Sequence, residues 1–495
     1  MKELKIIAIP LLLTVLAVSC KKDYLETRPS DAVTQQEIFG TTDKISSTLD
    51  AAYKTFFAFS PGGGGRHDDY GQKSWDLSND LMGTDMVVHT AGYGWYNPSY
   101  QYTEWQVATE NRQSDMAWFY YYNIIKQANT ILKTIDAATG TQYDKEKFKG
   151  EALGMRAYAY YFLINYYQQT YKGNETKPGI IIQLDPGDFE GKTRGTVQNV
   201  YDQIIADLTQ AETLLNGKTR VDKVHIDLSV VRGLRARVAL LMEDWPTAAA
   251  KASLARQGYS FMSPAQYASR SGFSSIGNPE WMWGSYIPSD QSTIYASFFS
   301  HIDVTNFGYA ALGTQKKITK ALYDQIPAGD IRKTVFQAPG TGTAVSPDYN
   351  QLKFQVPTPG NWAADYVYMR SAEMYLIQAE ALARQGQDAA ARTVLETMVK
   401  QRNAAYSAAS FSGTGLINEI LVQRRIELWG EGFSLIDIKR LKLGLNRPTG
   451  PGNHGSPNFD PSVYILGASD PKFLMRIPQK ELDSNPALTS ADQNP

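Results

Sequence analysis

Apolar side chains recur every three or four residues in three separate stretches of this 495-residue chain, at 152–166, 231–245 and 374–382. In the first stretch, Ala152, Met155 and Ala159 follow one another at this spacing. Such a spacing lines one face of an α-helix. We therefore expect a mainly α-helical fold, in which alanine-rich faces let neighbouring helices approach closely.

The second and third stretches also resemble each other. Residues 239–248 align without a gap with residues 381–390, and in both a small residue precedes a turn and further alanines. This is the helix–turn–helix pattern of tetratricopeptide (TPR) repeats, and Pro246 fits the first turn of the second helix of such a pair. Because one pair cannot bury its apolar faces alone, we predict a TPR-like scaffold of stacked helical pairs.

The helical period is interrupted at 60–112 and 259–368, where glycine, serine, proline and aromatic residues dominate. Within the second interruption, residues 280–283 are a candidate short strand with Trp281 and Trp283 on one face, because side chains alternate along a strand. We therefore predict two irregular, loop-rich insertions with a few short strands. Ligand sites usually lie on loops that a rigid scaffold holds, so we expect a site in these insertions.

The N-terminus has the features of an export signal. Two early lysines precede an apolar run at 6–18, and small Ser19 is followed by Cys20, the one cysteine of the sequence. This order is typical of a secretory signal peptide, and the apolar run is shorter than the ~20 residues that cross a bilayer. We predict a signal peptide at 1–19 and a lipid anchor on Cys20. The alternative is a plain signal peptide that leaves a free thiol.

The charge and the histidines argue against several functions. The formal net charge is −1, whereas nucleic acids and anionic membrane surfaces attract basic proteins. None of the five histidines has metal-ligand spacing, and no nucleophile elbow or P-loop occurs. Residues 76–83 resemble the start of a calcium loop, but Leu81 stands where such a loop needs glycine. We therefore expect no enzyme, cofactor or nucleic-acid partner, and turn and capping roles for residues 76–83.

Aromatic side chains are concentrated in the first insertion. A sugar ring has an apolar face that packs on a flat aromatic ring, and hydroxyls that bond to amide, carboxylate or guanidinium groups. We expect ligand contacts from the run Tyr93, Trp95, Tyr96 and Asn97, from the preceding Arg66 and Asp69, and from Tyr286 and Tyr295 in the second insertion. The alternative is that these rings pack the insertions onto the helices, as we expect for Trp75, Trp105 and Trp118.

Six motifs in a fixed order resemble the SusD/RagB family. Four are helical: residues 151–167, 194–211, 229–245 and 368–381. A fifth motif is charged and comprises Arg425, Glu427, Glu431-Gly432 and residues 437–440, with Gln423 and Ser434 departing from the family pattern. The sixth is the tail from Ile477-Pro478 to Asn494-Pro495. We expect the charges of the fifth motif to pair within the scaffold.

The resemblance implies a mostly helical, non-catalytic lipoprotein at the cell surface. Such a protein captures glycans and lies as a lid on a SusC-like TonB-dependent transporter of the outer membrane, and the lipid on Cys20 would be its one attachment to the membrane. The resemblance also divides the mature chain into a SusD-like N-terminal region (20–258) and a SusD/RagB C-terminal region (259–495). Two alternatives stay open: capture of peptides, as in some members, and an adaptor that binds the transporter alone.

Overall fold

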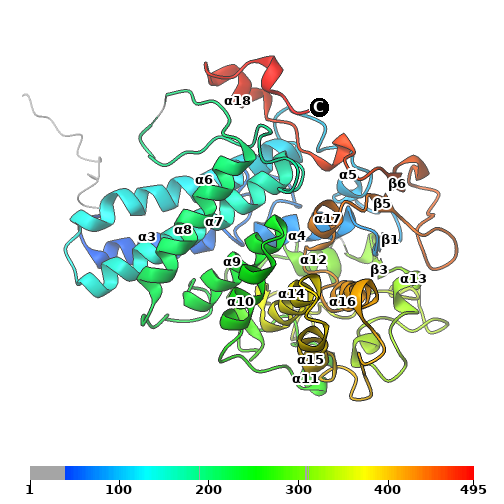
Figure 1. Ribbon diagram of the computed structural model, residues 1–495. Helices are drawn as coiled ribbons and strands as arrows, with labels where there is room; N and C mark the ends of the chain where they lie inside the picture. The colour runs from blue at the N-terminus through cyan, green and yellow to red at the C-terminus, as the bar shows by residue number, and fades with distance from the viewer. Residues whose placement is uncertain (1–38, 189, 307–308, 310) are drawn as a thin grey trace, which may run out of the picture.

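The computed structural model describes residues 39–188, 190–306, 309 and 311–495. The predicted signal peptide and Cys20 lie outside these residues. Long helices occupy one side of the molecule, and short helices, strands and loops occupy the other (Figure 1). Among the described residues, no helix combines the length and the apolar character that crossing a membrane requires. The predicted fold class, mainly α with a few short strands, is confirmed.

The N-terminal half supplies a layer of long helices packed side by side. The central helix contacts both of its neighbours in the chain, so nearly all of its second half is buried. Threonines begin three of these helices, because the hydroxyls of Thr41, Thr141 and Thr196 accept main-chain N–H groups of the first turn. The layer consists of α3 (Thr42–Lys54), α6 (Gln113–Thr134), α7 (Gln142–Tyr167) and α8 (Val197–Leu215).

Two helical pairs confirm the TPR-like prediction. They are α9 (Leu228–Met242) with α10 (Trp245–Ala255), and α14 (Ser371–Arg384) with α15 (Asp388–Val399). The aligned segments coincide with the two turns, where Glu243 (φ 60°) and Gly386 (φ 73°) take the left-handed conformation. Pro246 lies in the first turn of α10, as predicted, and α10 packs against α14.

One boundary of the helical prediction was wrong. Trp245 was expected on the apolar face of the second stretch, but it is the first residue of α10. The left-handed Glu243 ends α9 at Met242, and the carboxylate of Asp244 then accepts the main-chain N–H of Thr247 to begin the next helix. Because apolar residues keep the spacing of three and four across this turn, the sequence pattern does not reveal where α9 ends.

The first insertion contains a helix that we predicted as loop. Helix α4 (Gln72–Leu81) is buried along its whole length, although most of its residues are polar. Lys73 pairs with Asp76 at 3.1 Å, and the carboxylate of Asp80 accepts the main-chain N–H groups of Gly432 at 2.9 Å and Ser434 at 3.0 Å. Residues 76–81 are therefore helical, and these two acidic groups bond within the protein.

In the part of the chain that the structure describes, three two-stranded antiparallel sheets complete the fold. They pair β1 (Met86–Val88) with β3 (Lys316–Ile318), β2 (Trp281–Ser285) with β4 (Tyr366–Arg370), and β5 (Leu445–Asn446) with β6 (Ile465–Leu466). Strand β2 confirms the predicted strand, but its register shifts at Trp283, and both tryptophans are buried. The remaining α-helices of the described residues are α5 (Asn97–Tyr100), α11 (Pro264–Ala268), α12 (Phe298–Ile302), α13 (Lys320–Tyr323), α16 (Gly413–Glu427), α17 (Ser434–Arg440) and α18 (Gln479–Ser484).

The main hydrophobic core runs through both predicted regions of the mature chain. It extends in sequence from Ile45 to Leu488, and Trp75, Trp105 and Trp118 belong to it as expected. A smaller core lies between α14, α15 and α16. The residues before and after position 258 therefore share one interior.

The charged C-terminal motif pairs within the scaffold, as expected. Arg370 reaches Glu280 at 2.6 Å and both Glu427 and Glu431 at 2.7 Å, and Arg402 reaches Glu280 and Glu427. All five side chains are almost completely buried. Burial alone would raise the pKa of Glu431, but Arg370 and Lys353 outweigh it and lower the pKa to about 2. These ion pairs join the end of α16 to β4 and to the residue before β2.

Candidate ligand-binding site

Aromatic side chains from three distant segments meet on the surface of the insertions. The ring of Tyr309 stacks on Tyr93, with 4.7 Å between centroids and 22° between planes. It meets Tyr295 and His67 edge-on, each at 5.2 Å. His67 in turn lies 5.0 Å from Trp95 and 5.5 Å from Tyr295. We call these five residues the aromatic cluster.

Hydrogen bonds join three rings of the aromatic cluster, those of Trp95, Tyr309 and His67. The indole Nε1 of Trp95 donates to the hydroxyl of Tyr309 at 3.2 Å. The hydroxyl hydrogen of Tyr309 is then free to be donated to Nδ1 of His67, 3.1 Å away. His301 donates from Nε2 to the carbonyl of His67 at 2.8 Å. Burial, reinforced by Lys316, lowers the pKa of His301 to about 3, so this imidazole is neutral.

The cluster presents flat apolar faces to solvent. Tyr93 is 63% exposed and Tyr295 is 52% exposed, while His67, Trp95 and Tyr309 are half-buried. Rings of this kind combine an apolar face with a polar edge, as ligands with apolar faces and hydroxyl edges require. Because their orientation is already fixed, little conformational entropy is lost when a ligand packs against them.

A tight turn presents Tyr93 and Trp95. The main-chain N–H of Gly94 donates to the carbonyl of Ala91 at 2.9 Å, and the side-chain amide of Asn97 donates to the same carbonyl at 3.1 Å. Gly92 has φ +47°, and a Cβ there would lie 2.2 Å from the carbonyl oxygen of Gly313. The structure thus places the predicted Asn97 behind the turn, as a support for the two rings.

Arg66 and Asp69 shape the loop that carries His67. Both carboxylate oxygens of Asp69 accept the N–H of Gly62, at 3.1 and 3.2 Å. Burial raises the pKa of Asp69 to about 6, and these N–H groups partly oppose the rise. Arg66 pairs with Asp68 at 2.8 Å and with Glu104 at 2.9 Å. In this structure the charged groups of both residues bond within the protein, and ligand contact from them stays a prediction.

Tyr96 lies beneath the cluster and not on its surface. Its side chain is 3% exposed, and its hydroxyl bonds to Tyr70 and to Ser74. Its ring meets the imidazole of His301 edge-on at 5.1 Å. Burial raises its pKa well above the ordinary value of tyrosine. We therefore leave Tyr96 out of the ligand-contacting surface and assign it to the support.

Tyr286 lies in a separate depression. Its ring is 58% exposed, and it lines a hollow of about 840 Å³ together with Phe57, Val221 and other residues. The structure therefore brings together Tyr93, Trp95 and Tyr295 from the predicted set and leaves Tyr286 apart from them.

Tyr309 and His301 were missed by the sequence analysis. Neither lies in a motif or at a periodic position, and 214 residues separate Tyr309 from its partner Trp95. Local sequence carries no signal for such a contact. The richness of the second insertion in aromatic residues was the one available hint.

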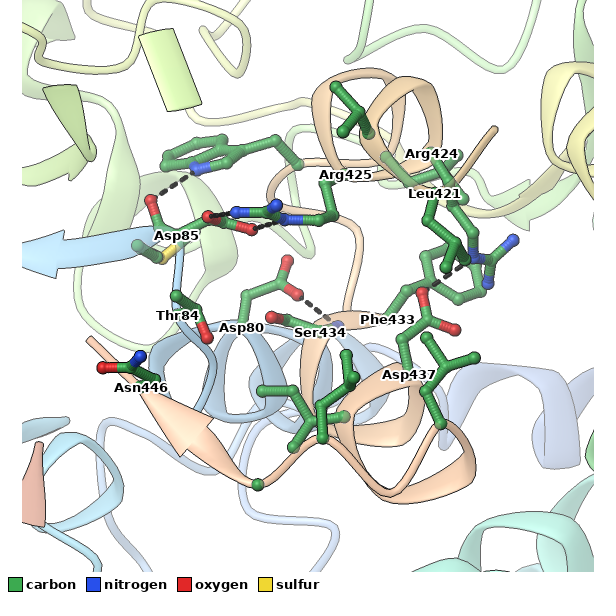
Figure 2. A pocket seen from close by; sticks show the side chains of 18 of the residues that line it. Asp80, Thr84, Asp85, Leu421, Arg424, Arg425, Phe433, Ser434, Asp437 and Asn446 are labelled. Carbon is green, nitrogen blue, oxygen red and sulfur yellow. Dashed lines mark hydrogen bonds and ion pairs between the residues drawn. The ribbon is translucent and has the colours of Figure 1, made fainter. Parts of the chain in front are cut away.

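Another pocket lies between α16, α17 and β5 (Figure 2). It encloses about 490 Å³ and is lined by Leu421, Phe433 and other apolar residues. Its charged groups are paired: Arg425 reaches Asp85 at 2.6 Å and Arg424 reaches Asp437 at 2.7 Å (Figure 2). This pocket has apolar walls without an exposed flat ring, so the aromatic cluster is the better candidate for a ligand with hydroxyl groups.

Within the described ranges, no group of three or more histidine, cysteine, aspartate or glutamate side chains could hold a metal ion. The chemistry that the cluster itself offers is stacking and hydrogen bonding.

Two family models match the chain. The model for "Starch-binding associating with outer membrane", a SusD-like family, matches residues 24–240, and the SusD family model matches residues 343–495. Trp95 lies inside the first match, whereas Tyr286, Tyr295 and Tyr309 lie between the two. A search of the curated proteins finds no match.

Solved structures share the fold over nearly the whole chain. A SusD-like carbohydrate-binding protein from Bacteroides vulgatus is 29% identical, with a TM-score of 0.80, and the match covers 92% of this chain and 99% of that one. A SusD superfamily protein from Bacteroides thetaiotaomicron is 22% identical, with a TM-score of 0.76 and coverage of 92% and 100%. Surface glycan-binding protein A from the same species is 18% identical, with a TM-score of 0.69 and coverage of 92% and 99%.

Proposed function

Because the chain belongs to the SusD/RagB family, we propose that it is a cell-surface lipoprotein that captures glycans without cleaving them. The aromatic cluster is the observation that carries this proposal. Trp95, Tyr93 and Tyr295 offer ring faces to sugar rings, while Tyr309 and His67 hold them in place. A carbohydrate-binding function agrees with the description of the matched family, whose members bind starch and associate with the outer membrane.

We also propose a destination for the captured glycan. Captured glycan would pass to a SusC-like TonB-dependent transporter, and Cys20 would carry the lipid that keeps the protein at the outer membrane. Fixed, solvent-facing rings suit such a transfer, because a shallow stacking site binds with modest affinity and releases its ligand readily. The same rings favour sugars over peptides, since an extended peptide is usually held by main-chain hydrogen bonds along a sheet edge or groove.

The test is a titration of the protein from Lys21 onward against oligosaccharides of several linkages and against short peptides. We expect saturable binding of a glycan, and a rise in melting temperature that grows with its concentration. Trp95→Ala should weaken this binding by about two- to ten-fold, since a well-oriented ring contact is worth ~0.5–1.5 kcal/mol. The variant should unfold at nearly the wild-type temperature.

Trp118→Ala is the matched control. Trp118 is a core tryptophan that is 8% exposed, so its loss should lower stability and leave glycan affinity of the folded protein unchanged. Binding of peptides and of no glycan would indicate that the protein captures peptides, the alternative function. Turnover of any oligosaccharide by the purified protein would contradict the proposal of a non-catalytic binder.

A further inference from the structure

The hollow around Tyr286 has the composition of a second sugar-binding surface. The ring of Tyr286 is 58% exposed, and Val221 in the same lining is 72% exposed. The half-buried Phe57 adds a second aromatic ring to the lining. Lys54 and Gln291 lie at the same hollow and offer an ammonium and an amide, which bond to hydroxyl groups. We call this set the Tyr286 depression.

A network of buried hydrogen bonds fixes the floor of the Tyr286 depression. The hydroxyl of Tyr53 donates to Glu151 at 2.7 Å and accepts the main-chain N–H of Ile226 at 2.8 Å. The imidazole of His225 lies 2.9 Å from the same Glu151 and 3.4 Å from Asp50. These bonds join α3, α7 and the segment before α9. The fold itself therefore holds the floor of the hollow in place.

Two segments of chain link the Tyr286 depression to the aromatic cluster. One segment runs from Phe57 to His67, and the other runs from Tyr286 to Tyr295. The two tyrosines are nine positions apart in the chain, so the second segment spans at most ~32 Å, since an extended chain covers ~3.3–3.6 Å per residue. The two exposed tyrosines therefore lie within reach of one oligosaccharide chain of moderate length.

Both ends of the second segment are anchored to the interior. Next to Tyr286, the main-chain N–H of Ile287 donates to the carboxylate of Asp365 at 2.9 Å. Beyond Tyr295, the N–H of Phe298 donates to the hydroxyl of the buried Tyr366 at 2.9 Å. Asp365 and Tyr366 are adjacent residues at the start of β4, so one edge of the sheet holds both ends of the segment.

We propose that the Tyr286 depression is a second glycan-binding surface, and that one long glycan chain packs on the aromatic cluster and on Tyr286 together. This inference rests on the proposed function, because it assigns a second contact to the same ligand. Two weak contacts on one chain gain affinity through effective concentration. A long glycan is therefore held more tightly than a short one, and each contact alone stays weak enough for release.

The experiment compares three variants of the protein from Lys21 onward: Tyr286→Ala, Trp95→Ala and Phe119→Ala. Phe119 is an exposed ring, 56% accessible, that belongs to neither surface and serves as the matched control. The probes are amylopectin, galactomannan, xyloglucan and pectin in affinity gels. For each glycan that retains the wild type, its disaccharide and its octasaccharide are then titrated by calorimetry.

We expect Tyr286→Ala to bind the disaccharide within about two-fold of the wild type and the octasaccharide at least about ten-fold more weakly. Trp95→Ala should weaken binding of both, and Phe119→Ala should change neither. Octasaccharide affinity of Tyr286→Ala within two-fold of the wild type would overturn the second surface and leave the proposed function intact. A wild type that no glycan of the panel retains would overturn both.

Discussion

The indole of Trp95 donates its hydrogen to the hydroxyl of Tyr309 across 3.2 Å, although 214 residues separate the two in the chain. The bond ties the first insertion to the second. It also leaves the hydroxyl hydrogen of Tyr309 for His67. One phenol therefore sets the orientation of two other members of the aromatic cluster.

Tyr309→Phe tests this arrangement. The change removes the hydroxyl but keeps the ring that stacks on Tyr93. We expect glycan affinity to fall about two- to ten-fold, because the lost hydrogen bonds, worth ~0.5–1.5 kcal/mol each, no longer fix the rings. Calorimetric titration measures the change. Tyr143→Phe is the control, since Tyr143 is an exposed ring, 44% accessible, that belongs neither to the aromatic cluster nor to the Tyr286 depression, and this variant should bind like the wild type.

The buried ion pairs give a prediction about stability. Arg370→Met removes the cation that pairs with Glu280, Glu427 and Glu431. The three carboxylates would stay buried with less positive charge beside them, which should lower the free energy of unfolding by about 3–5 kcal/mol. Urea unfolding followed by circular dichroism measures it. Lys480→Met, which removes an exposed pair with Glu110, should leave the midpoint unchanged, and an equal loss in both variants would contradict the prediction.

Asp80 makes stability depend on pH. Burial raises its pKa from 3.8 to about 7, against the opposing N–H groups of Gly432 and Ser434. The folded state therefore prefers the protonated acid. Its contribution to stability is complete below about pH 3.8 and is lost as pH rises through about 7.

Asp80→Asn keeps a neutral side chain at every pH. Relative to the wild type, we expect this variant to gain stability between pH 5 and pH 8, which urea midpoints at the two values measure. A constant difference between the two proteins over this range would show that Asp80 does not titrate there.

Gly432 occupies a position that no other residue fits. Its φ is +92°, and a Cβ would lie 2.7 Å from the Cα of Asp76 in α4. Gly432→Ala should cost about 2–4 kcal/mol of stability, from the left-handed backbone and from the clash together. Gly258 has φ +85° with nothing within 4 Å of its Cβ position, so Gly258→Ala should show the backbone cost alone, about 1–2 kcal/mol. Equal losses would mean that α4 yields to the added methyl group.

Cys20 is predicted to carry lipid. We expect the wild-type protein, made in a bacterium that processes lipoproteins, to incorporate labelled palmitate and to sediment with the membrane fraction. Cys20→Ser should lose the label and appear in the soluble fraction. A variant that stays with the membrane would place the anchor elsewhere.

Local patterns predicted the parts of the fold that local interactions determine. The α9–α10 and α14–α15 pairs follow from apolar spacing and from turn residues such as Gly386. The charged motif around Glu427 was expected to pair within the scaffold, and it does. Helix α4 escaped prediction because its polar groups, Asp80 among them, bond to residues about 350 positions away, and no window of sequence contains both partners.

The candidate site was predictable only in part, for the same reason. An aromatic run marks Trp95 and Tyr93 as unusual, but it does not distinguish them from Tyr96, whose ring points into the core. That distinction depends on Tyr70, Ser74 and His301, which pack around Tyr96. Tyr309, which organises the aromatic cluster, follows no pattern in its own neighbourhood.

The contact between α4 and Gly432 also sets an order of events during folding. Helix α4 lies near the start of the chain, yet the N–H of Gly432 that bonds to Asp80 comes 352 residues later. Until that late segment arrives, the carboxylate of Asp80 lacks the two N–H groups that it accepts. Contacts so far apart in sequence form slowly. Helix α4 therefore completes its buried hydrogen bonds only when the segment between α16 and α17 reaches it, so folding of this helix depends on nearly the whole chain being present.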